Sequence, residues 1–486
     1  MLKLTRKWLT YYSAGILICI LNSCGVTYND RIIGLEQNLV NQNFSAALQV
    51  IEDNKFLSKN RNELLYLMEK GKVEHMLGNF EKSNVLFEKA YTLIENQIQS
   101  NVGQAIASNL TNPMAKPYKG EDFEKVTIHY YMALNYFQLG MPNEALVEAK
   151  RINIKLNQLN QRYKKNKNKY TEDAFAQILQ GLLYEATGDI NNAFIAYRNA
   201  ANLYLENDGV YYEVPLPYQL QKDLLRTAKV LGFTEEYNFY QNKFKIPESE
   251  IVYQPAEAII FWENGLGPAK DQTQLTLVEN AFVSINDEYG SFFLPIPPGL
   301  NVGITSLAIP KYLERESYYV AGSVSTNDQE IPFETVEDYY PIARQCLQDR
   351  MLREVIDMAV RLTTKKATSA GLSSLAKQLL GEDAKDIVKV SADAAGAITE
   401  KADTRNWQSL PATISYARVS LESDKENIFT LNRYRNSKVD KDTIHIDHKR
   451  GLQLVSFFDV GKTAPKVIEP TLKENKKTEE FLMESN

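Results

Sequence analysis

The stretch from Gly181 to Ala200, Gly-Leu-Leu-Tyr-Glu-Ala-Thr-Gly-Asp-Ile-Asn-Asn-Ala-Phe-Ile-Ala-Tyr-Arg-Asn-Ala, decides the fold of the first half of this chain. Gly188 lies about two helical turns after Gly181. Glycine ends a helix at little cost because it readily adopts a left-handed conformation. A second helical pattern follows, in which Ala193 and Ala200 are small and Tyr197 is aromatic. The stretch therefore predicts two antiparallel helices that approach closely through small residues.

The same spacing of small residues, aromatics and a turn glycine recurs earlier in the chain. The residues expected to pack the repeats are Gly71, Gly78, Phe80, Phe87, Ala90, Ala133, Tyr136, Gly140, Ala145, Gly181, Tyr184, Gly188, Ala193, Tyr197 and Ala200. A weaker copy lies at 225–237 and a partial, capping copy at 44–51. These units resemble tetratricopeptide (TPR) repeats, whose period is about 34 residues. The spacing here is longer and uneven, which predicts an irregular array; a generic helical bundle is the alternative.

The start of the chain has the pattern of a secretory signal. Lys3, Arg6 and Lys7 precede an apolar run at 14–21, which is shorter than the roughly 20 apolar residues of a membrane span. The run ends in Leu-Asn-Ser-Cys24, which resembles the lipobox of bacterial lipoproteins. That resemblance implies a signal peptide at 1–23 and a lipid on Cys24. The alternative is an ordinary cleaved signal followed by a chance cysteine.

Charge and cysteine content narrow the class of protein. Removal of residues 1–23 takes away three of the 55 Lys and Arg residues and none of the 61 Asp and Glu residues, so the remaining chain has a net charge of −9. An acidic balance argues against general nucleic-acid binding. Beyond Cys24 only Cys346 remains. No internal disulfide is therefore expected, and Cys346 is expected to be a small core residue.

From about residue 246 the pattern changes from helices to strands. The predicted strands lie at 258–262, 275–278, 292–296, 302–309, 318–324, 412–421, 428–432, 442–447 and 452–460. Apolar stripes at helical spacing predict a pair of helices within about 338–402. The predicted fold class is thus α+β and multidomain. Its parts are TPR-like helical repeats at 24–245, an antiparallel β domain with an inserted helical pair at 246–465, and a disordered tail at 466–486.

The candidate chemical motifs are weak. Gly265 to Lys270 follows a strand but lacks the spacing of a phosphate loop, so a turn is expected. His445 and Asp447 would share one face of a strand, while His448 would face the other way. We therefore predict no metal, no cofactor and no catalytic residue.

The most distinctive loop is Asp403-Thr-Arg-Asn-Trp-Gln-Ser-Leu-Pro411. Asp403, Arg405 and Trp407 are the candidates for a recognition site, since aromatic and arginine side chains dominate binding hot spots. The alternative, which we favour, is that the loop fixes the helical pair to the sheet with Trp407 as a packing anchor.

Three segments together resemble an uncharacterised family of bacterial TPR lipoproteins with a β-rich C-terminal half. They are 118–124, 145–151 and the Asp403–Pro411 loop. The resemblance covers most of the chain after the signal. It implies a lipid anchor and an envelope location, and it brings no established activity.

The predicted function is a non-enzymatic scaffold or assembly factor that binds an envelope protein on the concave face of the repeats, through the first helix of each pair. In lipoprotein families an acidic residue after the anchor favours retention in the inner membrane. Gly25 therefore points to the outer membrane, and the lack of an acidic cluster just after Cys24 favours its periplasmic face. One alternative is a surface lipoprotein that binds glycans or nutrients. Another is an envelope hydrolase whose converging carboxylates would lie in a cleft between the two halves.

Overall fold

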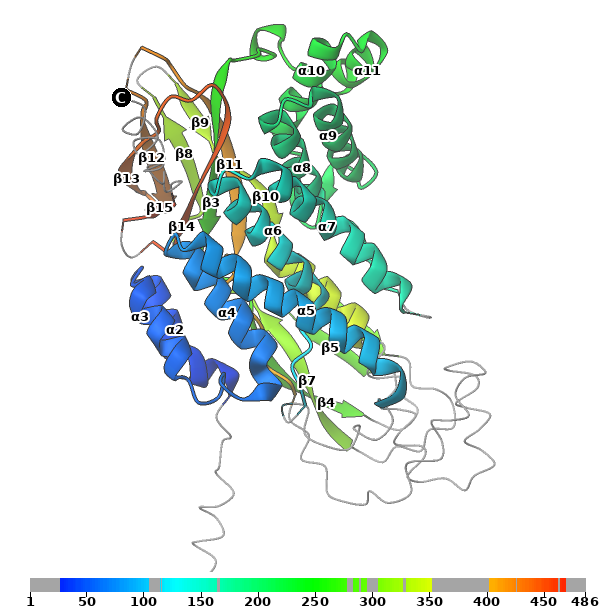
Figure 1. Cartoon of the computed structure of the whole chain (residues 1–486). Helices are drawn as coiled ribbons and strands as arrows, with labels where there is room; N and C mark the ends of the chain where they lie inside the picture. The colour runs from blue at the N-terminus through cyan, green and yellow to red at the C-terminus, as the bar shows by residue number, and fades with distance from the viewer. Residues whose placement is uncertain are drawn as a thin grey trace, which may run out of the picture.

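The computed structural model describes residues 27–104, 114, 116–163, 167–277, 283–287, 290–294, 305–326, 329–351, 402–424, 426–461 and 464–468. A helical array packs along one side of a β-sandwich (Figure 1). The predicted signal peptide, Cys24 and most of the predicted helical pair lie outside the described residues. Within them, no helix is long and apolar enough to cross a membrane.

The helical array consists of antiparallel pairs. Its helices are α2 (Tyr28–Val40), α3 (Phe44–Asp53), α4 (Glu63–Met76), α5 (Phe80–Gln104), α6 (Asp122–Gln138), α7 (Pro142–Gln161), α8 (Ala174–Ala186), α9 (Ile190–Leu205), α10 (Tyr218–Leu231) and α11 (Thr234–Phe244). The pairs from α4 to α11 form the TPR-like repeat region, and α2 with α3 lies at its first end (Figure 1). Between the two helices of successive pairs, Gly78, Gly140, Gly188 and Gly232 adopt positive φ values of 78°, 74°, 80° and 71°.

Two glycines let the paired helices touch. A Cβ atom on Gly181 would lie 2.2 Å from the Tyr197 ring, and one on Gly71 would lie 2.7 Å from the Phe87 ring. Tyr197 and Phe87 are both fully buried. The first helix of a pair thus approaches the second at a position where only glycine fits. Of the other repeat positions, Phe80, Ala90, Ala133, Ala145, Ala193 and Ala200 are buried, while Tyr136 and Tyr184 are partly buried.

The β half is a sandwich of two sheets. One sheet has the order β10-β11-β3-β14-β15 and the other β13-β12-β8-β9. Their strands are β3 (Ala256–Asn264), β8 (Ala321–Ser325), β9 (Glu330–Pro332), β10 (Glu334–Asp338), β11 (Thr413–Ser420), β12 (Ile428–Arg435), β13 (Lys438–His445), β14 (Gly451–Asp459) and β15 (Lys466–Ile468). The remaining pairs are β1 (Val210–Tyr211) with β2 (Val214–Pro215), β4 (Ala269–Leu277) with β7 (Thr305–Leu313), and β5 (Val283–Asp287) with β6 (Gly290–Leu294).

Two details differ from the sequence prediction. Strands β3 and β14 pair in parallel, from Gly451 opposite Ala256 to Asp459 opposite Asn264, whereas the β domain was expected to be antiparallel. Pairing in parallel needs a long connection, which the intervening strands supply. Strand β15 pairs with β14 and takes in Lys466 to Ile468, which the sequence had assigned to a disordered tail.

Strand β3 lies at the centre of three layers, because every one of its residues is buried. Its alternate side chains face opposite sides. Ile260 and Trp262 join the core between the two sheets, whereas Ile259 and Phe261 join the core shared with the helices. Cys346, on the helical residues that follow β10, lies buried in this shared core, as expected of a small core residue. The repeat array and the first sheet are therefore held together by one continuous apolar core.

The close contact at Gly181 gives a prediction about stability. Gly181→Ala should lower the free energy of unfolding by about 2 kcal/mol, because the new methyl group overlaps a buried tyrosine whose hydroxyl is bonded to Glu185. Gly34→Ala is the matched control, since it also lies in a helix but leaves 3.6 Å to Val50. This control should raise stability by about 0.5–1 kcal/mol through helix propensity. Urea unfolding followed by circular dichroism measures both; equal effects would contradict the packing account.

Candidate functional site

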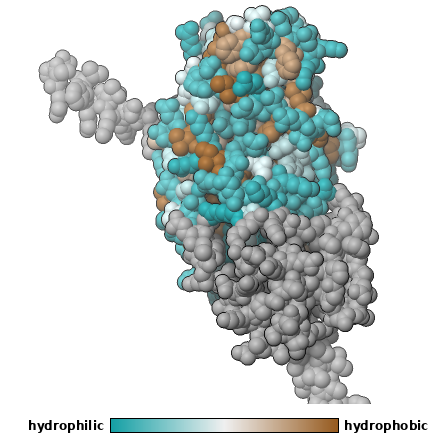
Figure 2. Space-filling model, turned by 90° about the vertical axis from the view of Figure 1, so that its right-hand side faces the viewer, coloured by the Kyte–Doolittle hydropathy of each residue, from teal (hydrophilic) through white to brown (hydrophobic). Residues whose placement is uncertain are grey.

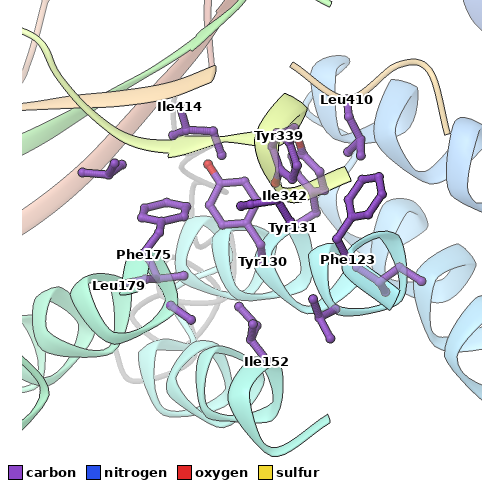
Figure 3. Close-up of a cluster of buried hydrophobic side chains, with 14 of the residues drawn as sticks. Phe123, Tyr130, Tyr131, Ile152, Phe175, Leu179, Tyr339, Ile342, Leu410 and Ile414 are labelled. Atoms are coloured by element: carbon purple, nitrogen blue, oxygen red, sulfur yellow. The ribbon is translucent and has the colours of Figure 1, made fainter. Parts of the chain in front are cut away.

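The inner face of the repeat array is covered by the chain itself. Helices α4, α6, α8 and α10, the first helix of each pair, face the sheet β10-β11-β3-β14 (Figure 1). Figure 3 shows Phe123, Tyr130 and Phe175 from α6 and α8 meeting Tyr339 and Ile414 from the β half. This corrects the expectation that the inner, concave face receives a partner, because the chain's own sheet already occupies it.

A buried ion pair joins the first repeat to the central strand. The Lys72 ammonium on α4 pairs with the Glu263 carboxylate on β3, and the two side chains are 0% and 2% exposed. The hydroxyls of Tyr131 and Tyr130 donate to the same carboxylate at 3.2 and 3.4 Å. Taking two charges out of water is costly unless further hydrogen bonds satisfy them. These tyrosines supply such bonds, so the contact holds α4, α6 and β3 in one arrangement.

A second charged cluster joins the last repeats to the sheet. The Arg418 guanidinium on β11 lies 2.6 Å from Glu185 on α8, 3.2 Å from Asp223 on α10 and 2.7 Å from Glu257 on β3. Arg226 also pairs with Glu185, at 2.6 Å. Burial alone would raise the pKa of Glu185, but Arg418 and Arg226 hold it well below its ordinary value. The Glu185 carboxylate therefore stays charged beside the two arginines, and the cluster fixes the register between helices and sheet.

The Asp403–Pro411 loop lies across the first repeats like a bound peptide. The Glu124 carboxylate accepts a hydrogen bond from the Trp407 amide at 2.7 Å. The Glu69 carboxylate accepts from the amides of Gln408 and Ser409 at 2.9 and 3.2 Å. The Trp407 ring centroid lies 5.8 Å from that of Phe87 and also 5.8 Å from that of Tyr131. Two helix carboxylates thus hold three consecutive amides of the loop.

The side chains of this loop are buried. Trp407 is 1% exposed and Arg405 is 0% exposed. The Arg405 guanidinium pairs with Asp403 at 2.6 Å and donates to the Asn62 side chain at 2.7 Å. A recognition site needs accessible side chains, so this position favours the role of packing anchor for Trp407.

The two glutamates that hold the loop have raised pKa values. Burial raises the pKa of Glu69 to about 7, and burial together with the charge of Glu121 raises that of Glu124. Converging carboxylates of this kind were the expected mark of a hydrolase. Here their oxygens are already bonded to loop amides and to the hydroxyls of Tyr28 and Tyr118. The pair is engaged in holding the structure together.

The other sequence candidates are separated in space or bonded elsewhere. His445 is more than half exposed and pairs with Glu426 at 2.9 Å. Gly265 adopts a positive φ of 69° between β3 and β4, and Lys270 pairs with the buried carboxylate of Glu121. The described residues include no group of three or more His, Cys, Asp and Glu side chains suited to a metal ion.

Sequence reasoning missed the charged residues at the helix–sheet interface. A signal was present, because Glu263 and Arg418 each interrupt an otherwise apolar strand pattern. A charge placed among core positions needs a buried partner. The partner's identity was hidden, since Arg418 and Glu185 are 233 positions apart.

Comparisons with known proteins give structural likenesses that each cover less than half of this chain. No family model matches the chain, and neither does any curated protein. Among solved structures, MamA matches at 16% identity over 43% of this chain and 92% of that chain, with a TM-score of 0.27. A Podosopora anserina protein with nearly identical TPR-like repeats matches at 12% identity over 43% and 90%, with a TM-score of 0.29. A Rap protein complexed with competence and sporulation factor matches at 14% identity over 46% and 54%, also with a TM-score of 0.29.

The outer side of the array carries apolar side chains in contact with solvent. On α7, Val147 is 48% exposed and Ile154 is 52% exposed, and their spacing of seven places them on one face. Val85 on α5 is 50% exposed and Phe239 on α11 is 54% exposed. Figure 2 shows hydrophobic patches of this kind on an otherwise hydrophilic side of the molecule. The second helices α5, α7 and α11 thus expose large apolar side chains, whereas α4, α6 and α8 expose none; α10 is an exception, because Val230 is 53% exposed.

The charged cluster around Arg418 gives a second prediction. Arg418→Met should lower the free energy of unfolding by about 3–5 kcal/mol, because it leaves Glu257 without its cation and leaves Glu185 and Asp223 with Arg226 alone. Lys229→Met removes the exposed partner of Glu248 and should leave the urea midpoint nearly unchanged. If both variants unfold at the wild-type midpoint, the cluster does not hold the two halves together.

A third prediction concerns acid stability. Burial and the nearby Lys72 charge lower the pKa of His75 to about 3, whereas an unfolded histidine titrates near 6.5. The unfolded state therefore binds more protons between these values, so His75 lowers stability by roughly 1.4 kcal/mol for each pH unit below about 6.5. His75→Gln should flatten the fall in urea midpoint between pH 6.5 and 4.5. The exposed His445→Gln is the control and should follow the wild-type curve.

Proposed function

We propose that this protein is a lipid-anchored, non-enzymatic binding protein of the bacterial cell envelope, and that the outer face of its repeat array holds a protein partner. The observation that carries the proposal is the division of the array into two faces. The inner face is closed by ion pairs and by the Asp403–Pro411 loop, while Val147 and Ile154 on α7 stay exposed. Exposed apolar side chains on a rigid scaffold are the usual centre of a binding surface.

The proposed lipid-bearing Cys24 lies only a few residues before the first described helix. Helix α2 begins at Tyr28, capped by Thr27 and shortly after Cys24, and Tyr28 is buried in the shared core. A lipid on Cys24 would therefore hold the α2 end of the array next to the membrane. The α11 end, at the opposite end of the array in Figure 1, would point away from the bilayer. We propose that the protein lies at the outer membrane, because Gly25 follows Cys24, and on its periplasmic face, because no acidic cluster lies just after Cys24.

The glycan-binding alternative needs an exposed tryptophan. Trp262 and Trp407 are the only tryptophans after the proposed signal peptide, and they are 2% and 1% exposed. Trp262 packs between the sheets against Phe333 and Phe457. Neither indole is placed to stack on a sugar, so the protein-binding proposal is the stronger one.

The proposed binding surface is tested by crosslinking in cells. A photo-reactive amino acid at Val147 or Ile154 should give a reproducible adduct with one envelope protein, identified by mass spectrometry. The same substitution at Val439, which is 44% exposed on β13, is the matched control and should not give that adduct. The double variant Val147→Glu, Ile154→Glu should weaken capture of the partner at least tenfold without changing the unfolding temperature. Absence of any adduct at α7, or an equal adduct at Val439, would contradict the proposal.

The proposed anchor is tested separately. Cys24→Ser should move the protein from the membrane fraction to the soluble fraction, or leave its signal peptide uncleaved. The reason is that acyl chains contribute about 0.8 kcal/mol of membrane binding per buried methylene. Mass spectrometry of the wild-type N-terminal peptide should show a diacylglyceryl-modified Cys24. An unmodified Cys24 in a membrane-bound protein would show that the anchor is wrong while leaving the α7 surface open to its own test.

A further inference from the structure

A β-bulge turns one carboxyl into the interior between the array and the sheet. Along β10 and β11, Thr335 lies opposite Ser415, but Glu337 rather than Val336 lies opposite Ile414. The extra residue shifts the alternation of side chains, so Glu337 takes the helix-facing side that Ile414 shares. Glu337 is only 6% exposed there. Bulges often re-aim a side chain towards a site in this way.

Within the part of the chain that the structure describes, no cation pairs with the Glu337 carboxyl. It lines a cavity with a volume of about 10 Å³, measured as the space open to the centre of a water molecule. Asp173 and Asp338 also line this cavity, and no lysine, arginine or histidine does. Among the described residues none donates a hydrogen bond to the Glu337 carboxyl. By contrast, Asp173 is satisfied by the Tyr170 hydroxyl at 2.7 Å and the Ala176 amide at 2.8 Å.

Aromatic rings make up the rest of the cavity wall. Tyr170, Tyr204, Tyr211 and Tyr212 all line it. Tyr212 sits in the β1–β2 turn with a positive φ of 45°, a conformation that is unusual for a bulky residue. This turn places the Tyr212 ring 5.4 Å from the Tyr170 ring at 88°. Glu213 also has a positive φ, of 65°, as the two central residues of a tight hairpin turn require.

We propose that this cavity binds the head of a primary ammonium group. A cation satisfies the unpartnered Glu337 carboxylate, and tyrosine faces attract cations electrostatically. Size selects the kind of cation, because the cavity has room for about one water-sized group and an –NH₃⁺ head is of that size, whereas a quaternary ammonium is far larger. The inference goes beyond the proposed partner surface and does not depend on it. The ammonium group comes either from a small free amine or from a lysine side chain.

Proton release accompanies binding. Burial, followed by the charges of Asp173 and Asp338, raises the pKa of Glu337 well above its ordinary value, which favours the protonated carboxyl in the empty site. The titratable groups that line the cavity with Glu337 come from several elements. They are Tyr170 and Asp173 just before α8, Tyr204 on α9, Tyr211 and Tyr212 on the β1–β2 hairpin, and Asp338 on β10. None carries a positive charge. The ammonium therefore replaces the carboxyl proton, and its affinity should rise with pH.

Calorimetry of the full chain tests the inference. Methylammonium chloride should bind and release up to one proton, seen as a dependence of the heat on the buffer's ionisation enthalpy at pH 7 and pH 8. Tetramethylammonium chloride at the same ionic strength should not bind. Glu337→Gln should reduce methylammonium affinity at least tenfold. The control Glu213→Gln, which removes an exposed acid of the hairpin paired with Arg344, should leave affinity unchanged.

A second amine distinguishes a lysine side chain from a small free amine as the ligand. Butylammonium, which mimics a lysine side chain, binds if the cavity takes a side-chain amine; if methylammonium alone binds, the ligand is a small free amine. If methylammonium fails to bind the wild-type chain, or binds no better than tetramethylammonium, the inference is overturned. The selectivity of the wild-type chain decides this even if Glu337→Gln does not fold. Equal affinity in a folded Glu337→Gln variant would also overturn it.

Discussion

Buried charge between the helices and the sheet is the constraint on which this structure depends. Lys72 with Glu263, and Arg418 with Glu185, are removed from water at the two ends of one interface. Each charge is stable there only while its partner, from the other half of the chain, stays in place. An apolar core alone would tolerate sliding of one layer over another, because hydrophobic contact has no direction. The paired charges remove that freedom and set a single register between the repeats and the sheet.

The same interface decides which surface is free for other molecules. Glu69 and Glu124, on the inner face of α4 and α6, bind the backbone amides of the Trp407 region much as a receptor binds an extended peptide. The array therefore already holds a ligand of its own. The proposed partner would meet the outer face of the array, where Val147 and Ile154 of α7 are exposed. The acidic cavity under the β1–β2 hairpin adds a separate small site within the same interface.

Local patterns predicted what lies within one helical pair or one strand. Gly181 and Tyr197 meet across a single turn, so their spacing in the sequence was enough to place both helices, and the apolar run at 258–262 located β3. Contacts between distant segments carried no such signal. The parallel pairing of β3 with β14 and the closure of the inner face by the sheet both join residues far apart in the chain. A periodic pattern shows which face of a helix is apolar, but it does not say whether a partner protein or the chain's own sheet covers that face. For the same reason the sequence favoured a packing role for Trp407 without excluding a recognition role, and it gave no sign of the Glu337 carboxyl that the bulge turns inwards.

The inner face of the repeats is permanently filled by the chain's own loop and sheet. Hydrogen exchange of the Trp407, Gln408 and Ser409 amides measures this most directly, because these donors bond to Glu124 and Glu69. These three amides should exchange as slowly as the amides of the central strand β3, because exchange at either place requires the whole interface to open. Exchange of the three amides much faster than that of β3, under native conditions, would mean that the loop leaves the groove, and it would contradict the account.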